Sequence, residues 1–285
     1  MNIVDRIFIA LQYCLPQKLL SRTVGMLAEC RSPWLKNLLI KAFIARYDVD
    51  MSEAQHASAE DYASFNDFFT RSLKPDSRQL DTAANSIVSP ADGLVSEAGS
   101  IQGDMLIQAK GQHYRLKCLL GGDAKLASNF ANGKFATIYL SPRDYHRVHM
   151  PSDGSLRKSI YIPGKLFSVN QATANHVPDL FARNERLVCI FDGPAGSYAI
   201  ILVGAMIVAG IETVWSGQVA PPNKLPSAID YGTAIELPRG AEMGRFKLGS
   251  TVILLFGGKT MHWHKHISAG QSVRVGETIG ALQGS

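Results

Sequence analysis

The chain has 285 residues, a net charge of +5, and 46% hydrophobic residues before its glycines are counted. This apolar content argues against intrinsic disorder, and the length allows one large domain with an appendage or two small domains. Four scattered cysteines without a CxxC pair argue against a disulfide framework or a zinc ribbon. They favour a reducing, cytoplasmic compartment.

The first 47 residues carry the whole net charge. They hold seven Lys and Arg and two acidic residues, so the remainder of the chain is neutral overall. Their apolar residues recur at helical spacing, which predicts two or three short amphipathic helices broken near Pro16 and Pro33. The positions that carry this pattern are Ile3, Ile7, Leu11, Leu20, Val24, Leu27, Leu35, Leu39 and Phe43.

A basic amphipathic helix suits the surface of an anionic membrane, where it lies on the bilayer without crossing it. The longest apolar run, residues 198–211, is too short to span and is interrupted by Gly204 and Gly210, so it predicts buried strands. The N-terminus lacks the features of a signal peptide. The alternative is that the helices pack on the rest of the chain or on a second subunit of a homodimer.

A further helix is expected in "ASFNDFFTRSL", where Phe65, Phe68, Phe69 and Leu73 form an apolar stripe that ends before Pro75. From about Ser86, short β-rich runs alternate with Gly, Pro, Asn and Asp. We therefore expect an α+β protein with a helical membrane-associating segment at 1–75. A β-rich catalytic domain, an antiparallel sheet or a barrel-like fold, is expected at 76–285.

Three motifs carry residues of chemical interest. "IVSPADGLV" contains Asp92, "LSPRDYHRVHMP" contains His146 and His149, and "KLGSTVILLF" contains Gly249 and Ser250. An Asp and a His that converge on Ser250 could activate its hydroxyl toward the carbonyl of Gly249, so that the chain cuts itself. Taken singly, each residue also has an ordinary explanation: a turn, a packed histidine, or a serine at the start of a strand.

The stretches "SPADG", "YLSPRDYHRVHMP", "YIPGKLFSVN", "LFARNERLVCIFDG", "VGAMIVAGIETVW" and "GRFKLGSTVILLF" resemble, in this order, the bacterial phosphatidylserine decarboxylases. The resemblance runs from the basic N-terminal segment to about residue 256. It implies a self-processing lyase that converts phosphatidylserine into phosphatidylethanolamine and CO2. Such an enzyme works at the cytoplasmic face of the cell membrane as a peripheral protein, and no nucleic-acid partner or metal is expected.

The resemblance also implies residue roles. His149 takes the Ser250 proton and Asp92 orients the imidazole, so that Ser250 attacks Gly249 and the precursor separates into chains 1–249 and 250–285. Ser250 becomes a covalent pyruvoyl group, which forms a Schiff base with the substrate amine and accepts electrons as CO2 leaves. His146 returns a proton to the α-carbon. Ser168 and Asn170 are candidate contacts for the lipid headgroup.

Three alternatives remain open at this point. A serine hydrolase could use Asp92, His149 and Ser250 without self-cleavage, although the chain lacks a G-x-S-x-G elbow. A metalloenzyme could use His262, His264 and His266, whose alternate spacing predicts one face of a strand. A non-catalytic scaffold on the membrane surface is the third.

Overall fold

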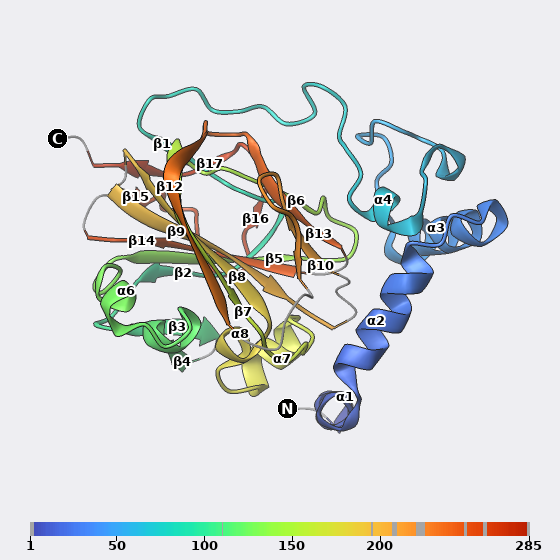
Figure 1. The fold of residues 1–285 in the computed structure, drawn as a ribbon, viewed down its shortest axis with the longest axis horizontal. Helices are drawn as coiled ribbons and strands as arrows, with labels where there is room; N and C mark the ends of the chain where they lie inside the picture. The colour runs from blue at the N-terminus through green and yellow to red at the C-terminus, as the bar shows by residue number, and fades with distance from the viewer. Residues whose placement is uncertain are drawn as a thin grey trace.

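The computed structural model describes residues 3–109, 111–194, 196–206, 210–220, 226–247, 250–258 and 261–283. Three helices come first: α1 (Ile3–Cys14), α2 (Gln17–Ala28) and α3 (Pro33–Tyr47). Pro16 directly precedes α2 and Pro33 begins α3, which confirms the two predicted breaks. The helices form an arm along one side of the β-rich domain (Figure 1).

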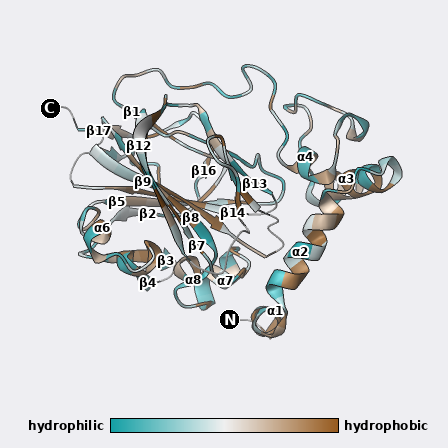
Figure 2. Cartoon of the chain, in the orientation of Figure 1, coloured by the Kyte–Doolittle hydropathy of each residue, from teal (hydrophilic) through white to brown (hydrophobic). Residues whose placement is uncertain are grey.

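The arm buries several polar side chains and leaves many apolar side chains exposed to solvent, although Ala28 and Ile40 are buried. Gln12, Gln17 and Ser21 are buried, and Figure 2 shows hydrophobic residues along the arm. The exposed apolar residues on the three helices include Ile3, Ile7, Leu11, Leu19, Met26, Trp34 and Leu38. Within the described residues, every helix is too short or too polar to cross a membrane.

The aromatic stripe forms a shorter helix than the sequence predicts. A 3-10 turn, η1 (Ala59–Asp61), is followed by α4 (Phe65–Phe69), whose first turn is capped by the Ser64 hydroxyl. The helix was expected to reach Leu73, but Leu73 instead forms a β-bridge with Ala54. Phe65, Phe68 and Phe69 are buried in a small core with residues of α2 and α3.

The centre of the molecule is an eight-stranded antiparallel sheet with two free edges, β12 and β16. Of the two forms expected, an antiparallel sheet or a barrel-like fold, the described strands adopt the first. In spatial order the strands are β12 (Ser227–Leu237), β7 (Gly154–Ile162), β8 (Arg186–Gly193), β9 (Gly196–Gly204), β14 (Ser250–Phe256), β5 (Lys134–Leu140), β2 (Gly93–Ser100) and β16 (Ser272–Val273).

Smaller elements cover the central sheet. One three-stranded sheet contains β1 (Ser86–Val88), β17 (Thr278–Leu282) and β15 (Met261–Trp263). A four-stranded sheet contains β11 (Gly217–Ala220), β10 (Gly210–Thr213), β13 (Glu242–Lys247) and β6 (Arg147–His149). The remaining elements are the hairpin β3 (Met105–Ala109) and β4 (Gln112–Arg115), and the short helices α5 (Leu116–Leu119), α6 (Ala124–Ser128), α7 (Gln171–His176) and α8 (Leu180–Arg183).

The central sheet is buried on both faces. Along β14, Ile253 and Leu255 join the core beneath the helices, while Val252 and Leu254 join the core shared with β6, β10 and β13. Side chains alternate between the faces of a strand, so Ser250 shares the face of Val252. The first residue of β14 therefore faces the side of the sheet on which His149 is carried.

Candidate active site

Strand pairing brings Ser250 and Asp92 to the same end of the central sheet. Ser250 lies opposite Leu140 of β5, and Leu94 of β2 lies opposite Tyr139 of the same strand. Asp92 directly precedes β2, so two strand spacings, about 10 Å, separate the backbones of β14 and β2 at this end. The chain leaves β5 here and continues into β6.

A backbone hydrogen bond joins His149 to the turn that contains Asp92. The backbone N–H of His149 donates to the carbonyl of Pro90 at 2.8 Å. Its ring Nδ1 donates to the carbonyl of Gly240 at 2.8 Å, because a carbonyl can only accept. Nε2 therefore accepts from the hydroxyl of Tyr145, at 3.0 Å. Burial lowers the pKa of His149, so the imidazole is neutral and Nε2 is its basic nitrogen.

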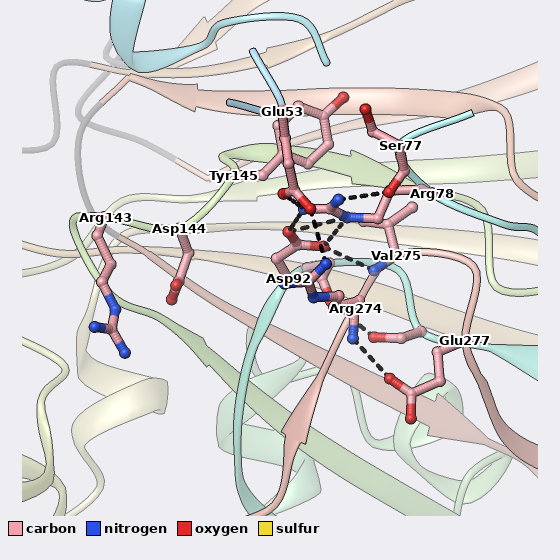
Figure 3. Close-up of polar contacts among 12 residues, drawn as sticks. Glu53, Ser77, Arg78, Asp92, Arg143, Asp144, Tyr145, Arg274, Val275 and Glu277 are labelled. Atoms are coloured by element: carbon pink, nitrogen blue, oxygen red, sulfur yellow. Dashed lines mark hydrogen bonds and ion pairs between the residues drawn. The ribbon is translucent and has the colours of Figure 1, made fainter. Parts of the chain in front are cut away.

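Asp92 is bonded to a residue that the sequence analysis did not single out. Arg78 Nε donates to its Oδ1 at 3.0 Å and to its Oδ2 at 3.2 Å, and the backbone N–H of Val275 donates to Oδ1 at 2.8 Å. Arg78 also bonds Glu53, at 2.8 Å. Figure 3 shows both carboxylates turned toward the Arg78 guanidinium. The described residues contain no hydrogen bond between Asp92 and His149.

Ser250 is fully buried, and its hydroxyl has no hydrogen-bond partner among the described residues. An unpaired buried hydroxyl is unusual because desolvation is then uncompensated, so it calls for an explanation, and a catalytic role is one. Gly249, the other half of the predicted cleavage site, lies outside the described residues.

His146 is also buried close to this end of the sheet. Its Nδ1 donates to the carbonyl of Asp144 at 2.8 Å, and the Phe69 ring packs on the imidazole with 4.0 Å between ring centres. Burial, with a contribution from the charge of Arg71, lowers the pKa of His146 to about 3. The ring is therefore neutral at pH 7, and its Nε2 has no partner among the described atoms.

The two candidate headgroup contacts lie in a loop held by the arm. The backbone N–H of Ser168 donates to Gln12 Oε1 at 2.8 Å, and the Asn170 side chain caps α7 by accepting from Thr173 N. Asn184 Nδ2 donates to the carbonyls of Phe167 at 2.8 Å and Gly204 at 2.9 Å. Gly204 pairs with Ser250, so this loop lies beside the start of β14.

The three C-terminal histidines do not share a strand face. Only His262 lies in β15, and His264 and His266 follow it. Ring centres are 6.3 Å apart for His262 and His264, and 5.8 Å apart for His264 and His266. In the part of the chain that the structure describes, no group of three or more His, Cys, Asp or Glu is placed to hold a metal ion.

Sequence reasoning missed three groups that bond the candidate residues. Tyr145 directly precedes His146 in the motif "LSPRDYHRVHMP". The motif therefore drew attention to this position, but nothing in it distinguished Tyr145 from its neighbours as a partner of His149. Nothing in the sequence pointed to Arg78 or to the Gly240 carbonyl, because an arginine in a polar loop and a glycine in a turn are ordinary.

The family model described as Phosphatidylserine decarboxylase matches residues 65–281, and a model described as PSD matches residues 7–48. The match extends beyond residue 256, where the motif resemblance was expected to end.

Three curated relatives are called phosphatidylserine decarboxylase proenzyme. The Ectopseudomonas mendocina protein is 54% identical over 98% of this chain and 99% of its own. The Bordetella pertussis protein is 55% identical over 96% of this chain and 94% of its own. The Alcanivorax borkumensis protein is 55% identical over 99% of this chain and 98% of its own. The chain therefore belongs to the phosphatidylserine decarboxylase family and is a carboxy-lyase.

Proposed function

We propose that this chain is the precursor of a phosphatidylserine decarboxylase and that it cleaves itself between Gly249 and Ser250. The observation that carries the proposal is the buried hydroxyl of Ser250, which has no hydrogen-bond partner among the described residues and lies at the end of the sheet where Asp92 and His149 are carried. A hydroxyl without a partner is free to approach a base and a carbonyl. Family membership favours this function over the serine hydrolase and the scaffold.

In the proposed cleavage, His149 Nε2 takes the proton from Ser250 Oγ, and Oγ attacks the carbonyl carbon of Gly249. The amide becomes an ester, and the proton goes to the former amide nitrogen. Elimination then removes the Cα proton of residue 250, breaks the Cβ–Oγ bond and releases chain 1–249 as a carboxylate. The dehydroalanine that remains tautomerises to an imine, and water hydrolyses the imine to the pyruvoyl ketone with loss of ammonia. In the precursor, Nε2 is bonded to the Tyr145 hydroxyl, so this contact has to open first. The negative charge of Asp92, which lies in the same turn as Pro90, stabilises the positively charged imidazolium of His149.

The two products would remain together because β14 is an interior strand. Its seven residues pair with β5 on one side and β9 on the other, so chain 250–285 keeps both ladders after the backbone is cut. Its apolar side chains are buried on both faces of the sheet. We therefore expect the large and small chains to copurify.

The group derived from Ser250 fits this position, since a ketone has no hydrogen to donate and the side chains that follow on the same face of β14, Val252 and Leu254, are apolar. A pyruvoyl group supplies an electron sink for the electron pair released when CO2 leaves. His146 is the proposed proton carrier. Its Nε2 holds a free lone pair in the precursor, so it must take up a proton before it can donate one.

We further propose that segment 1–75 places the catalytic domain, 76–285, on an anionic membrane as a peripheral protein. Support comes from the apolar surface of the arm and from a pocket of about 310 Å³ beside the junction of α1 and α2, lined by Lys18, Lys165 and Arg183 among others. A bilayer takes apolar side chains and its anionic headgroups attract the cations. Four free cysteines suit the cytoplasmic face.

Intact mass of the purified protein tests the cleavage. We expect a 1–249 chain and a 250–285 chain that is blocked at its N-terminus. S250A should remain one inactive polypeptide, whereas S100A, which changes an exposed serine on β2, should be cut normally. A single full-length chain that hydrolyses esters would instead establish the serine hydrolase.

Sedimentation with phosphatidylglycerol vesicles tests the membrane proposal. Ile7 on α1 is 57% exposed, and Val214, next to β10, is 51% exposed. I7D should weaken vesicle binding and V214D should not, because only the first lies on the arm. If a second copy covers the arm instead, I7D will dissociate a dimer in lipid-free buffer and leave vesicle binding unchanged, which analytical ultracentrifugation measures.

A further inference from the structure

Arg71 is a buried cation with few partners. Only 4% of the residue is exposed, and its Nη2 donates to the carbonyl of Arg143 at 2.9 Å. Its Nε and Nη1 have no hydrogen-bond partner among the described residues. Removing a guanidinium from water costs free energy unless its N–H groups are bonded, so an arrangement of this kind needs a compensating ligand.

Arg71 lines a cleft of about 520 Å³ that it shares with Asp92, Tyr139, Asp144 and Tyr145. Two other arginines of this cleft are already neutralised: Arg78 by Asp92 and Glu53, and Arg274 by Glu53. Arg71 makes no ion pair with any described residue of the cleft. A fourth arginine of the cleft, Arg143, is exposed to solvent and forms no ion pair among the described residues. Arg71 is therefore the buried charge that is available to a ligand within the cleft that Asp92 also lines.

The short helix α4 fixes Arg71 beside the candidate proton carrier. Cζ of Arg71 lies 5.6 Å from the ring centre of Phe68, and the next aromatic residue, Phe69, packs on His146. Arg71 also bonds the carbonyl of Arg143, three residues before His146. A ligand held by Arg71 is thus placed close to the His146 imidazole.

We propose that Arg71 is the anion-recognition residue of this cleft and that the phosphodiester of the lipid headgroup accepts hydrogen bonds from its free nitrogens. The inference rests on the proposed function. The headgroup carries two anions, a phosphodiester and a carboxylate. The carboxylate loses its charge as CO2 leaves, so a guanidinium bound to it would stabilise the substrate more than the transition state. The phosphodiester keeps its charge throughout and can be bound without that penalty.

Steady-state decarboxylation of phosphatidylserine in detergent micelles tests the inference with R71M and R71Q. Because a charge-assisted hydrogen bond is lost equally from substrate and transition state, we expect KM to rise on the order of tenfold. The value of kcat should stay within about twofold. The control is R157M, which removes an arginine that is 53% exposed and pairs with Asp192 away from this cleft. Its KM should equal that of the wild type.

Two soluble inhibitors distinguish the anions. Glycerophosphoethanolamine has the phosphodiester without the carboxylate, and serine has the carboxylate without the phosphodiester. We expect R71M to weaken inhibition by the first and to leave inhibition by the second unchanged. The reverse pattern would overturn the assignment to the phosphodiester.

Cleavage of the wild type tests the proposed function, and the KM of the Arg71 variants tests the role of Arg71. If the wild type is cut into two chains and decarboxylates its substrate, while R71M and R71Q keep the wild-type KM, Arg71 has no role in recognition. If R71M does not fold, R71Q decides by the same criterion, since its amide can still donate to the Arg143 carbonyl. A fall in melting temperature with unchanged KM in either variant would show a structural role only. A wild type that remains uncut refutes the proposed function instead.

Discussion

Asp92 and Arg78 form a buried ion pair at the centre of the candidate site. Only 12% of the Arg78 side chain and 11% of the Asp92 side chain is exposed, and Arg78 also binds Glu53. The carboxylate expected to orient His149 is thus held by a guanidinium in the precursor. Its distance from the imidazole is set by the Pro90 turn, to which the His149 backbone is bonded.

Replacing Arg78 should destabilise the precursor and slow its cleavage. R78M leaves Asp92 and Glu53 as neighbouring carboxylates without their shared cation, and removing one partner of a buried pair costs about 3 kcal/mol. Urea unfolding in the S250A background measures the loss. The matched variant R157M breaks an ion pair with 53% and 47% exposed side chains, so it should lose less than about 1 kcal/mol. Equal losses would contradict the buried role of Arg78.

Removing the Tyr145 hydroxyl should speed self-cleavage. In the precursor this hydroxyl donates to His149 Nε2, the nitrogen that we propose accepts the Ser250 proton. Y145F frees the lone pair at the cost of one hydrogen bond, about 1 kcal/mol, which corresponds to a rate increase of about fivefold. A gel time course of newly translated precursor measures the rate. Slower cleavage would mean that Tyr145 relays the proton instead of competing for it.

Gly93 is required for the close contact between β2 and β5. A Cβ at this position would lie 2.3 Å from the backbone oxygen of Tyr139, whereas a Cβ at Gly99 on the same strand would lie 3.8 Å from the Phe135 ring. G93A should therefore destabilise the precursor by about 2 kcal/mol and misplace Asp92, and G99A should change stability by less than about 1 kcal/mol. Thermal unfolding and cleavage yield of the two variants test the difference.

Acid should destabilise the folded precursor through His146. Burial lowers the pKa of this residue from 6.5 to about 3, so the unfolded chain binds a proton between these values that the folded chain does not. Stability is therefore lost as pH falls through this window, by up to about 1.4 kcal/mol per pH unit from this group. H146Q in the S250A background should show a correspondingly smaller loss, measured by urea unfolding at several pH values.

Comparing S250A with the H146Q variant in the same background separates the contribution of His146 to the pH dependence from the contributions of its neighbours. His149 also has a lowered pKa and acts in the same direction, while Asp144, whose pKa is raised by burial, gains a proton on folding and opposes it. These groups remain in both proteins. Identical pH profiles with and without H146Q would show that the buried imidazole does not contribute.

The local elements of this protein could be predicted because their signals are local. Pro16 and Pro33 delimit helices, since proline has no amide hydrogen and a fixed φ. Apolar runs such as 250–256 form strands buried on both faces. The resemblance carried by the motifs that contain Asp92, His149 and Ser250 implied a self-processing lyase, and family membership agrees with that interpretation.

The tertiary structure decided which hydrogen-bond partner each of these residues has. Asp92 bonds Arg78 and the amide of Val275, and His149 bonds Tyr145 and Gly240, contacts that span as many as 183 residues. It also decided the length of α4, which ends at Phe69, while Leu73 lies beyond the helix and pairs with Ala54. Burial lowers the pKa of His146 far below that of a free imidazole. Desolvation and long-range pairing depend on which segments fold against one another, and no local pattern in the chain encodes that.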